Sequence, residues 1–271
     1  MYKIRRGLLA MLLLSFLLPL SGHAAAIKAE GKVHLKINQY YVLYTAPQAP
    51  YLSNHRLYLP LRAVSQLLGG NAAYDPATKA AKIQLNNHTV EINAATKETY
   101  YDGLKAEGAA APQMVQQTLY VPIRVLIDGL KVDGSWDPNR QLFTVTDPSL
   151  SKTPLYINIR DFDATEVYNQ DAFYPLSFTY ERKKDKKDVY HLTLTVTARN
   201  VTGADIPEND EYLHPLYLFS SGAFSYDRKE DTPAVKKDEV ITRTWTRREL
   251  DSYQYILFEG ITGADRTIDL P

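Results

Sequence analysis

The sequence contains no cysteine among its 271 residues. This absence excludes a disulfide-stapled scaffold, a thiol nucleophile and the lipid-modified cysteine of a bacterial lipoprotein. A chain of this length buries enough apolar surface to fold without covalent cross-links. Net charge is absent as well, because 31 Lys and Arg residues balance 31 Asp and Glu residues. Neither half of the chain is basic enough to indicate nucleic acid as a partner.

Local catalytic and metal-binding motifs are also missing. Beyond His23, the histidines are isolated from one another, at His34, His55, His88, His191 and His214. There is no HExxH helix for a metal ion and no GxSxG turn for a serine nucleophile. The sequence therefore predicts no catalytic residue, no metal site and no cofactor. A catalytic group assembled from distant residues stays open, with a hydrolase as the class of enzyme to test.

Long apolar runs occur only at the beginning of the chain. The run at residues 7–20 follows three basic residues and precedes small ones. This order is typical of a secretory signal peptide, and the run is short for a membrane span. We expect a signal peptide at residues 1–24, with cleavage after Ala24 or after Ala26, and no transmembrane segment thereafter. The mature protein is expected to be secreted or associated with the cell envelope; an uncleaved anchor is the alternative.

An internal repeat organises the first half. The sequence LYLPLR at residues 57–62 returns as LYVPIR at 119–124, and Asp75-Pro76 returns as Asp137-Pro138. Both recurrences are displaced by 62 positions. A constant displacement over two separate motifs indicates a duplicated supersecondary unit.

Each unit predicts a strand, a helix and a hairpin. Pro60 and Pro122 end a strand and suit the first turn of a helix, since proline lacks an N–H and has a fixed φ. In the first unit an apolar stripe at helical spacing follows, and Gly69-Gly70 stops it. In the second unit we expect a helix from Ile123 to about Asp128 and a strand that ends at Trp136. Two such units are expected to share the core of one α+β domain.

The motifs LYLPLR…LL…YDP and LYVPIR…WDP resemble the copper amine oxidase N-terminal-like domain, the stalk domain of secreted Gram-positive proteins. The resemblance covers residues 31–148. Tyr74 stands where the family usually has tryptophan, and Leu130-Lys131 lacks the usual glycine after the second helix. The resemblance implies a non-catalytic envelope module and implies no copper.

The second half has a different pattern of apolar and polar residues. Leu155, Ile157 and Ile159 alternate with other residues, and so do apolar residues and threonines at 190–197. Several such strands without a helix predict an antiparallel β-sandwich at residues 153–271, and short motifs resemble the Ig-like domains of secreted bacterial proteins. Residues 148–154 are the expected linker.

The repeated arginines are the first candidate site. Arg62 and Arg124 fall in the first turn of each predicted helix, where a positive charge opposes the helix dipole. We expect Asp75 and Asp137 to pair with them, which makes Pro60, Arg62, Asp75, Pro122, Arg124, Trp136 and Asp137 a structural motif. The alternative is that the two arginines bind an anionic ligand.

Exposed tyrosines are the second candidate site. Tyr44 and Tyr51 fall in a proline-containing segment predicted to be a loop, where aromatic rings can stack on sugars or anchor a partner. The alternative is that alternation along strands makes these tyrosines half-buried sheet residues. The partner would be cell-wall polysaccharide or another envelope protein. The function expected from these observations is non-catalytic binding or scaffolding at the cell envelope, and an envelope-directed hydrolase or hydrolase inhibitor is the alternative.

Charged runs complete the candidates. Acidic residues at 161–166 and 205–211 could hold calcium, but neither run has the EF-hand pattern, so solvated loops are favoured. The run KKDKKD at 183–188 predicts a charged hairpin tip.

Overall fold

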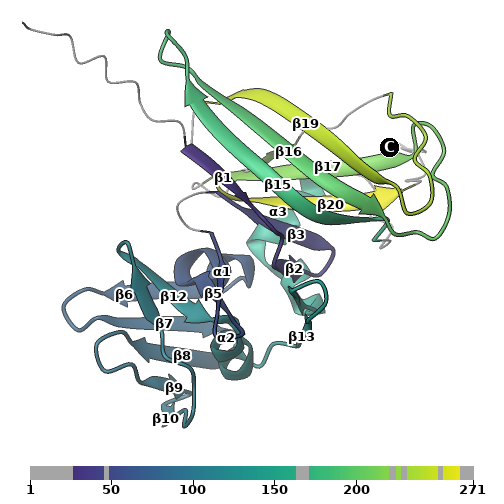
Figure 1. The fold of residues 1–271 in the computed structure, drawn as a ribbon. Helices are drawn as coiled ribbons and strands as arrows, with labels where there is room; N and C mark the ends of the chain where they lie inside the picture. The colour runs from purple at the N-terminus through teal and green to yellow at the C-terminus, as the bar shows by residue number, and fades with distance from the viewer. Residues whose placement is uncertain are drawn as a thin grey trace, which may run out of the picture.

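The fold was analysed in a computed structural model, which describes residues 27–45, 49–162, 171–219, 224–226, 231–249 and 253–262. The predicted signal peptide lies outside these residues. The described chain is mostly β-strand, arranged in four sheets with a few short helices (Figure 1). Among the described strands, β14 and β2 pair in parallel, and every other pairing between named strands is antiparallel.

Two of the sheets belong to residues 51–122. The short-strand sheet has the order β11 (Gln113–Val115), β12 (Thr118–Pro122), β5 (Arg56–Pro60) and β4 (Tyr51–Ser53). The five-stranded sheet has the order β10 (Leu104–Lys105), β9 (Thr99–Tyr101), β8 (His88–Asn93), β7 (Ala80–Leu85) and β6 (Asn71–Asp75).

The other two sheets combine early and late parts of the chain. The seven-stranded sheet has the order β13 (Gly134–Asp137), β14 (Leu142–Val145), β2 (Leu35–Ile37), β3 (Tyr40–Tyr44), β20 (Tyr253–Thr262), β17 (Glu211–Phe219) and β18 (Phe224–Tyr226). The long-strand sheet has the order β1 (Ile27–Gly31), β15 (Phe173–Lys184), β16 (Tyr190–Asn200) and β19 (Val240–Glu249).

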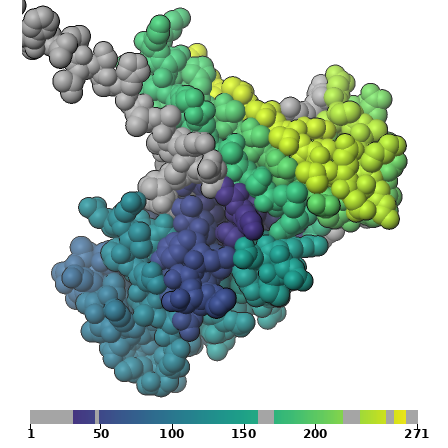
Figure 2. Space-filling model, viewed as in Figure 1, coloured from purple at the N-terminus to yellow at the C-terminus, as the bar shows by residue number. Residues whose placement is uncertain are grey.

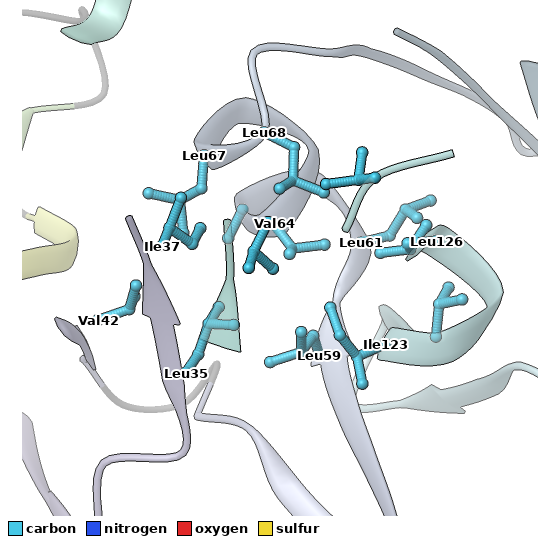
Figure 3. Close-up of a cluster of buried hydrophobic side chains, with 14 of the residues drawn as sticks. Leu35, Ile37, Val42, Leu59, Leu61, Val64, Leu67, Leu68, Ile123 and Leu126 are labelled. Carbon is cyan, nitrogen blue, oxygen red and sulfur yellow. The ribbon is translucent and has the colours of Figure 1, made fainter. Parts of the chain in front are cut away.

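Two helices begin directly after a proline. Helix α1 (Leu61–Leu67) follows Pro60, and helix α2 (Ile123–Leu130) follows Pro122, each proline having extended backbone angles. Both helices contribute to one buried cluster together with β5 and β2, as Figure 3 shows for Val64, Leu126 and Leu59. An apolar stripe on each helix therefore packs into the same core.

The short-strand sheet is symmetrical in sequence about its centre. Leu59 pairs with Val121, which lies 62 positions later, and the outer strands β4 and β11 are displaced by the same interval. Tyr58 pairs with Pro122, and Pro60 pairs with Tyr120. Exchanging residues 62 positions apart thus maps this pairing onto itself.

A helix occurs where the alternation of Leu155, Ile157 and Ile159 predicted a strand. Helix α3 spans Pro154–Phe162, and the expected linker contains a 3-10 helix at Pro148–Lys152. Proline at the first helical position explains the difference, since Pro154 starts the turn. Tyr156 and Ile159, three positions apart, then bury one helix face.

The early strands connect the two halves. Strand β3 pairs with β20, and β1 pairs with β15, so sheet hydrogen bonding crosses the expected linker. A second buried cluster lies between the long-strand sheet and the β3-β20-β17 part of the seven-stranded sheet, with Leu194 and Phe258 among its members. Figure 2 shows the early residues between a blue-to-teal lobe and a green-to-yellow lobe. The late strands thus form two facing sheets that include β1 and β3.

Candidate functional site

Tyr44 is buried in strand β3 and does not lie in a loop. Its side chain is 2% exposed, because β3 runs between β2 and β20 in the interior of the seven-stranded sheet. Burial raises the pKa of the Tyr44 hydroxyl well above its usual value. This position gives a ligand no access to the ring in the described structure, so the expectation of an exposed Tyr44 is wrong.

Tyr51 lies in strand β4 and is half-buried in an aromatic cluster. Its ring stacks on Tyr58 with the centroids 5.3 Å apart and the planes 6° from parallel, and it lies 5.0 Å from the ring of Tyr120. Its hydroxyl donates a hydrogen bond of 2.7 Å to Oε1 of Gln113. The structure therefore places Tyr51 in the packing of the short-strand sheet, apart from Tyr44, and a binding role for Tyr51 stays a prediction.

Arg62 and Arg124 are exposed, and no carboxylate in the described ranges pairs with either. The expected partners serve the turns instead. Asp75 accepts hydrogen bonds from the N–H of Ala77 at 2.9 Å and the hydroxyl of Thr78 at 2.7 Å. The Thr78 hydroxyl, followed by the Ala77 N–H, lowers the pKa of Asp75.

Asp137 has the same role in the second turn. It accepts hydrogen bonds from the N–H groups of Asn139 at 2.9 Å and Arg140 at 3.1 Å. An aspartate followed by proline readily closes such a turn on the backbone two residues later. The prediction that Asp75 and Asp137 pair with Arg62 and Arg124 is therefore wrong. The N–H donors of both guanidinium groups have no carboxylate partner in the described residues.

Arg124 lines an open cavity of about 360 Å³ at the beginning of α2. Its floor includes the buried side chains of Leu57, Ile123 and Val125, and its exposed residues include Arg56. The complete lining is His55, Arg56, Leu57, Tyr101, Gly108, Ala109, Ala110, Pro122, Ile123, Arg124, Val125, Asp128, Trp136 and Phe143. We name this the α2 cavity.

Arg62 lines a second open cavity, of about 240 Å³, at the beginning of α1. Its exposed residues include Tyr74 and Met114. The complete lining is Pro60, Leu61, Arg62, Ala63, Ala72, Ala73, Tyr74, Met114, Gln117, Thr118 and Leu119. We name this the α1 cavity.

Eight residues that line one cavity each have a counterpart 62 positions away in the chain that lines the other cavity. The pairs are Gln117 with His55, Thr118 with Arg56, Leu119 with Leu57, Pro60 with Pro122, Leu61 with Ile123, Arg62 with Arg124, Ala63 with Val125, and Tyr74 with Trp136. Each cavity combines the helix start and aromatic residue of one segment with the hairpin turn of the other. This arrangement follows from the symmetrical pairing of β5 with β12.

The sequence motif located part of this site. Pro60, Arg62, Pro122, Arg124 and Trp136 were identified from their recurrence, and all five line a cavity. The turn residues at 55–56 and 117–118 were missed, because nothing in their own sequence connects them to a helix that is distant in the chain. The displacement of one turn from the other by 62 positions was the signal that could have linked both turns to the repeat.

The charged runs have structural partners. Asp205 accepts hydrogen bonds from Lys236 Nζ and from the N–H of Lys237, both at 2.8 Å. Asp185 accepts N–H donors at the tip between β15 and β16, as a charged hairpin tip requires. Asp163 and Glu166 lie outside the described residues. Within the described ranges, no group of three or more His, Asp or Glu side chains is arranged to hold a metal ion.

Comparison with known protein families identifies part of the chain. Residues 28–145 match the family model of the copper amine oxidase N-terminal domain. This confirms the resemblance carried by the repeated proline and arginine motifs. No curated protein matches the chain. In the part of the chain that the structure describes, no helix has the length and hydrophobicity needed to cross a membrane.

Proposed function

We propose, starting from the copper amine oxidase N-terminal domain at residues 28–145, that this protein is an exported, non-catalytic binding protein of the cell envelope. In this proposal residues 1–24 are the signal peptide, residues 31–148 are a stalk-like module built from two duplicated units, and residues 153–271 are an Ig-like sandwich. Strands β1 and β3 join the module to the sandwich by sheet pairing.

The observation that carries the proposal is the α2 cavity. Its buried apolar residues and its exposed arginines combine an apolar surface with guanidinium donors that pair with no carboxylate in the described ranges. Concave sites with an apolar lining and a few polar groups are the usual form of a ligand site. The lining of the α2 cavity therefore supports a ligand site within the matched region.

The experiment is cosedimentation of the mature protein with purified cell-wall material. We expect binding by the wild type and a loss of about tenfold in affinity for the double variant Arg56→Ala/Arg124→Ala. Arg199→Ala is the matched control, because Arg199 is an exposed arginine on β16 outside both cavities. Equal binding by the double variant, or turnover of wall material by the wild type, would contradict the proposal.

Export has its own test. N-terminal sequencing of protein recovered from the culture medium should begin at Ala25 or at Ile27. Strand β1 begins at Ile27, so either cleavage leaves this strand intact for pairing with β15. Recovery of the intact leader in a membrane fraction would support the uncleaved anchor instead.

A further inference from the structure

We propose that the α1 and α2 cavities are two related sites for one anionic polysaccharide, with a carboxylate-bearing sugar ring as the unit that each site recognises. This inference rests on the proposed function and deepens it by naming the class of ligand and the number of sites. It is carried by the two cavities, which lie at positions related by the 62-residue displacement.

The charge of both cavities favours an anion. The α1 cavity is lined by Arg62 and by no acidic residue, and the α2 cavity is lined by Arg56 and Arg124 against Asp128. An arginine in the first helical turn costs stability, because its charge opposes the helix dipole. In the described structure neither Arg62 nor Arg124 has a carboxylate that offsets this cost. A bound carboxylate would accept two parallel hydrogen bonds from each guanidinium group.

An aromatic ring accompanies the arginine in each cavity. Tyr74 is 40% exposed in the α1 cavity, and Trp136, half-buried, occupies the corresponding position in the α2 cavity. Aromatic side chains provide a flat apolar face and a polar edge, which suits a sugar ring with its C–H face and its hydroxyl groups. A small inorganic anion would leave the aromatic ring without a contact, and a neutral sugar would leave the arginine without a carboxylate.

The two cavities differ in a way that predicts unequal affinity. Arg56 in the α2 cavity corresponds to Thr118 in the α1 cavity, so the α2 cavity has one more cationic group. Tyr101 and residues 108–110 add a further wall to the α2 cavity, which is also the larger of the two. The α2 cavity is therefore the tighter site. A polymer that reaches both cavities gains avidity, because its second contact forms at high effective concentration.

The experiment is titration calorimetry of the mature protein with trigalacturonate, followed by binding to polygalacturonate, neutral dextran and poly(glycerol phosphate). We expect two unequal sites for the trimer and tighter binding of polygalacturonate than of the trimer. Dextran should not bind. Poly(glycerol phosphate), which has no sugar ring, should bind at least tenfold more weakly than polygalacturonate.

The variants assign the sites. Arg124→Ala should remove the tighter trimer site, Arg62→Ala should remove the weaker one, and Arg199→Ala should leave both. Trp136→Leu should weaken the tighter site about tenfold while the circular dichroism spectrum of the protein stays unchanged. Each arginine removed is exposed, so folding of these variants is expected.

Failure of the inference is distinguishable from failure of the proposed function. Suppose that the protein binds wall material but binds dextran as tightly as polygalacturonate. That result would overturn the anionic-sugar sites alone, and so would unchanged trimer binding by both Arg62→Ala and Arg124→Ala. Poly(glycerol phosphate) that binds as tightly as polygalacturonate overturns the sugar ring as the recognised unit. Absence of binding to any wall fraction overturns the proposed function itself.

Discussion

The segments at 51–85 and 113–145 follow the same order of elements, yet they end in different sheets. Each has two short strands, then a helix that follows directly after a proline, and then a hairpin. The first hairpin, β6–β7, continues into β8 and forms the five-stranded sheet, whereas the second, β13–β14, pairs with β2 in the seven-stranded sheet. The two segments thus share an order of elements, and their hairpins pair with different neighbouring strands.

Core truncation at matched helix positions should produce the largest effect. Val64 and Leu126 differ by 62 positions, and both are fully buried in the shared core. We expect Leu126→Ala to lower the free energy of unfolding by about 2–5 kcal/mol. Val64→Ala should cost roughly 1–3 kcal/mol, because it removes fewer carbon atoms. Urea denaturation measures both, and a larger loss for Val64→Ala would show that the two helices are not packed as described.

Gly129 tests how closely α2 approaches the five-stranded sheet. A Cβ atom added there would lie 2.4 Å from Cγ2 of Val90 and 2.6 Å from Cδ1 of Tyr101. We therefore expect Gly129→Ala to destabilise the protein by about 1–3 kcal/mol, although alanine is the better helix former. Gln66→Ala, at an exposed position on α1, is the control and should change thermal stability little. A stabilising Gly129→Ala would mean that this close approach does not exist.

The residues after the two helices should respond with opposite signs. Gly69 and Lys131 differ by 62 positions and have positive φ values of 69° and 56°. Because glycine adopts this conformation without strain, Lys131→Gly should raise the free energy of unfolding by about 0.5–1 kcal/mol. Gly69→Ala should lower it, since the added Cβ would also lie 2.4 Å from Cγ2 of Thr153. Changes of the same sign in chemical denaturation would break the correspondence between the two helix ends.

The smallest effect concerns the two turns. The Thr78 hydroxyl is the first cause of the lowered pKa of Asp75, and Arg140 occupies the corresponding position beside Asp137. A lowered pKa contributes stability that is present above the unfolded pKa and is lost as pH falls through the folded pKa. Thr78→Val should raise the pKa of Asp75 toward its usual value, as carboxyl-carbon NMR would show. An unchanged Asp75 titration would contradict the assigned hydrogen bond.

Local signals predicted the helix starts, while distant pairing was not accessible from the sequence. Pro60 and Pro122 placed the helices because proline acts through its own fixed φ. The segment from Leu155 to Ile159 was misassigned, because alternation over so short a run does not distinguish a strand from a buried helix face. Tyr44 was placed in a loop, since its partner strand β20 lies at the far end of the chain.

The candidate site divides in the same way. Arg62, Arg124 and Trp136 were found because they lie inside the repeated motif. The predicted pairing of Arg62 and Arg124 with two aspartates was wrong, since both carboxylates accept hydrogen bonds within their own turns. The contribution of His55 and Arg56 required knowledge that β5 pairs with β12, which brings one segment's turn against the other segment's helix.

The pairing of the earliest strands with the latest has a consequence for how the chain reaches its native state. Strand β1 pairs with β15, and β3 pairs with β20, so each early strand has a partner that is made much later. The long-strand sheet and the seven-stranded sheet therefore cannot be completed until almost the whole chain is available. Pairings between such distant residues close slowly, because the entropy of a long loop is lost before the contact is gained. The two sheets of residues 51–122 need no late strand, so they can form first, and only the sheets that contain β1 and β3 must stay incomplete until the last strands have been made.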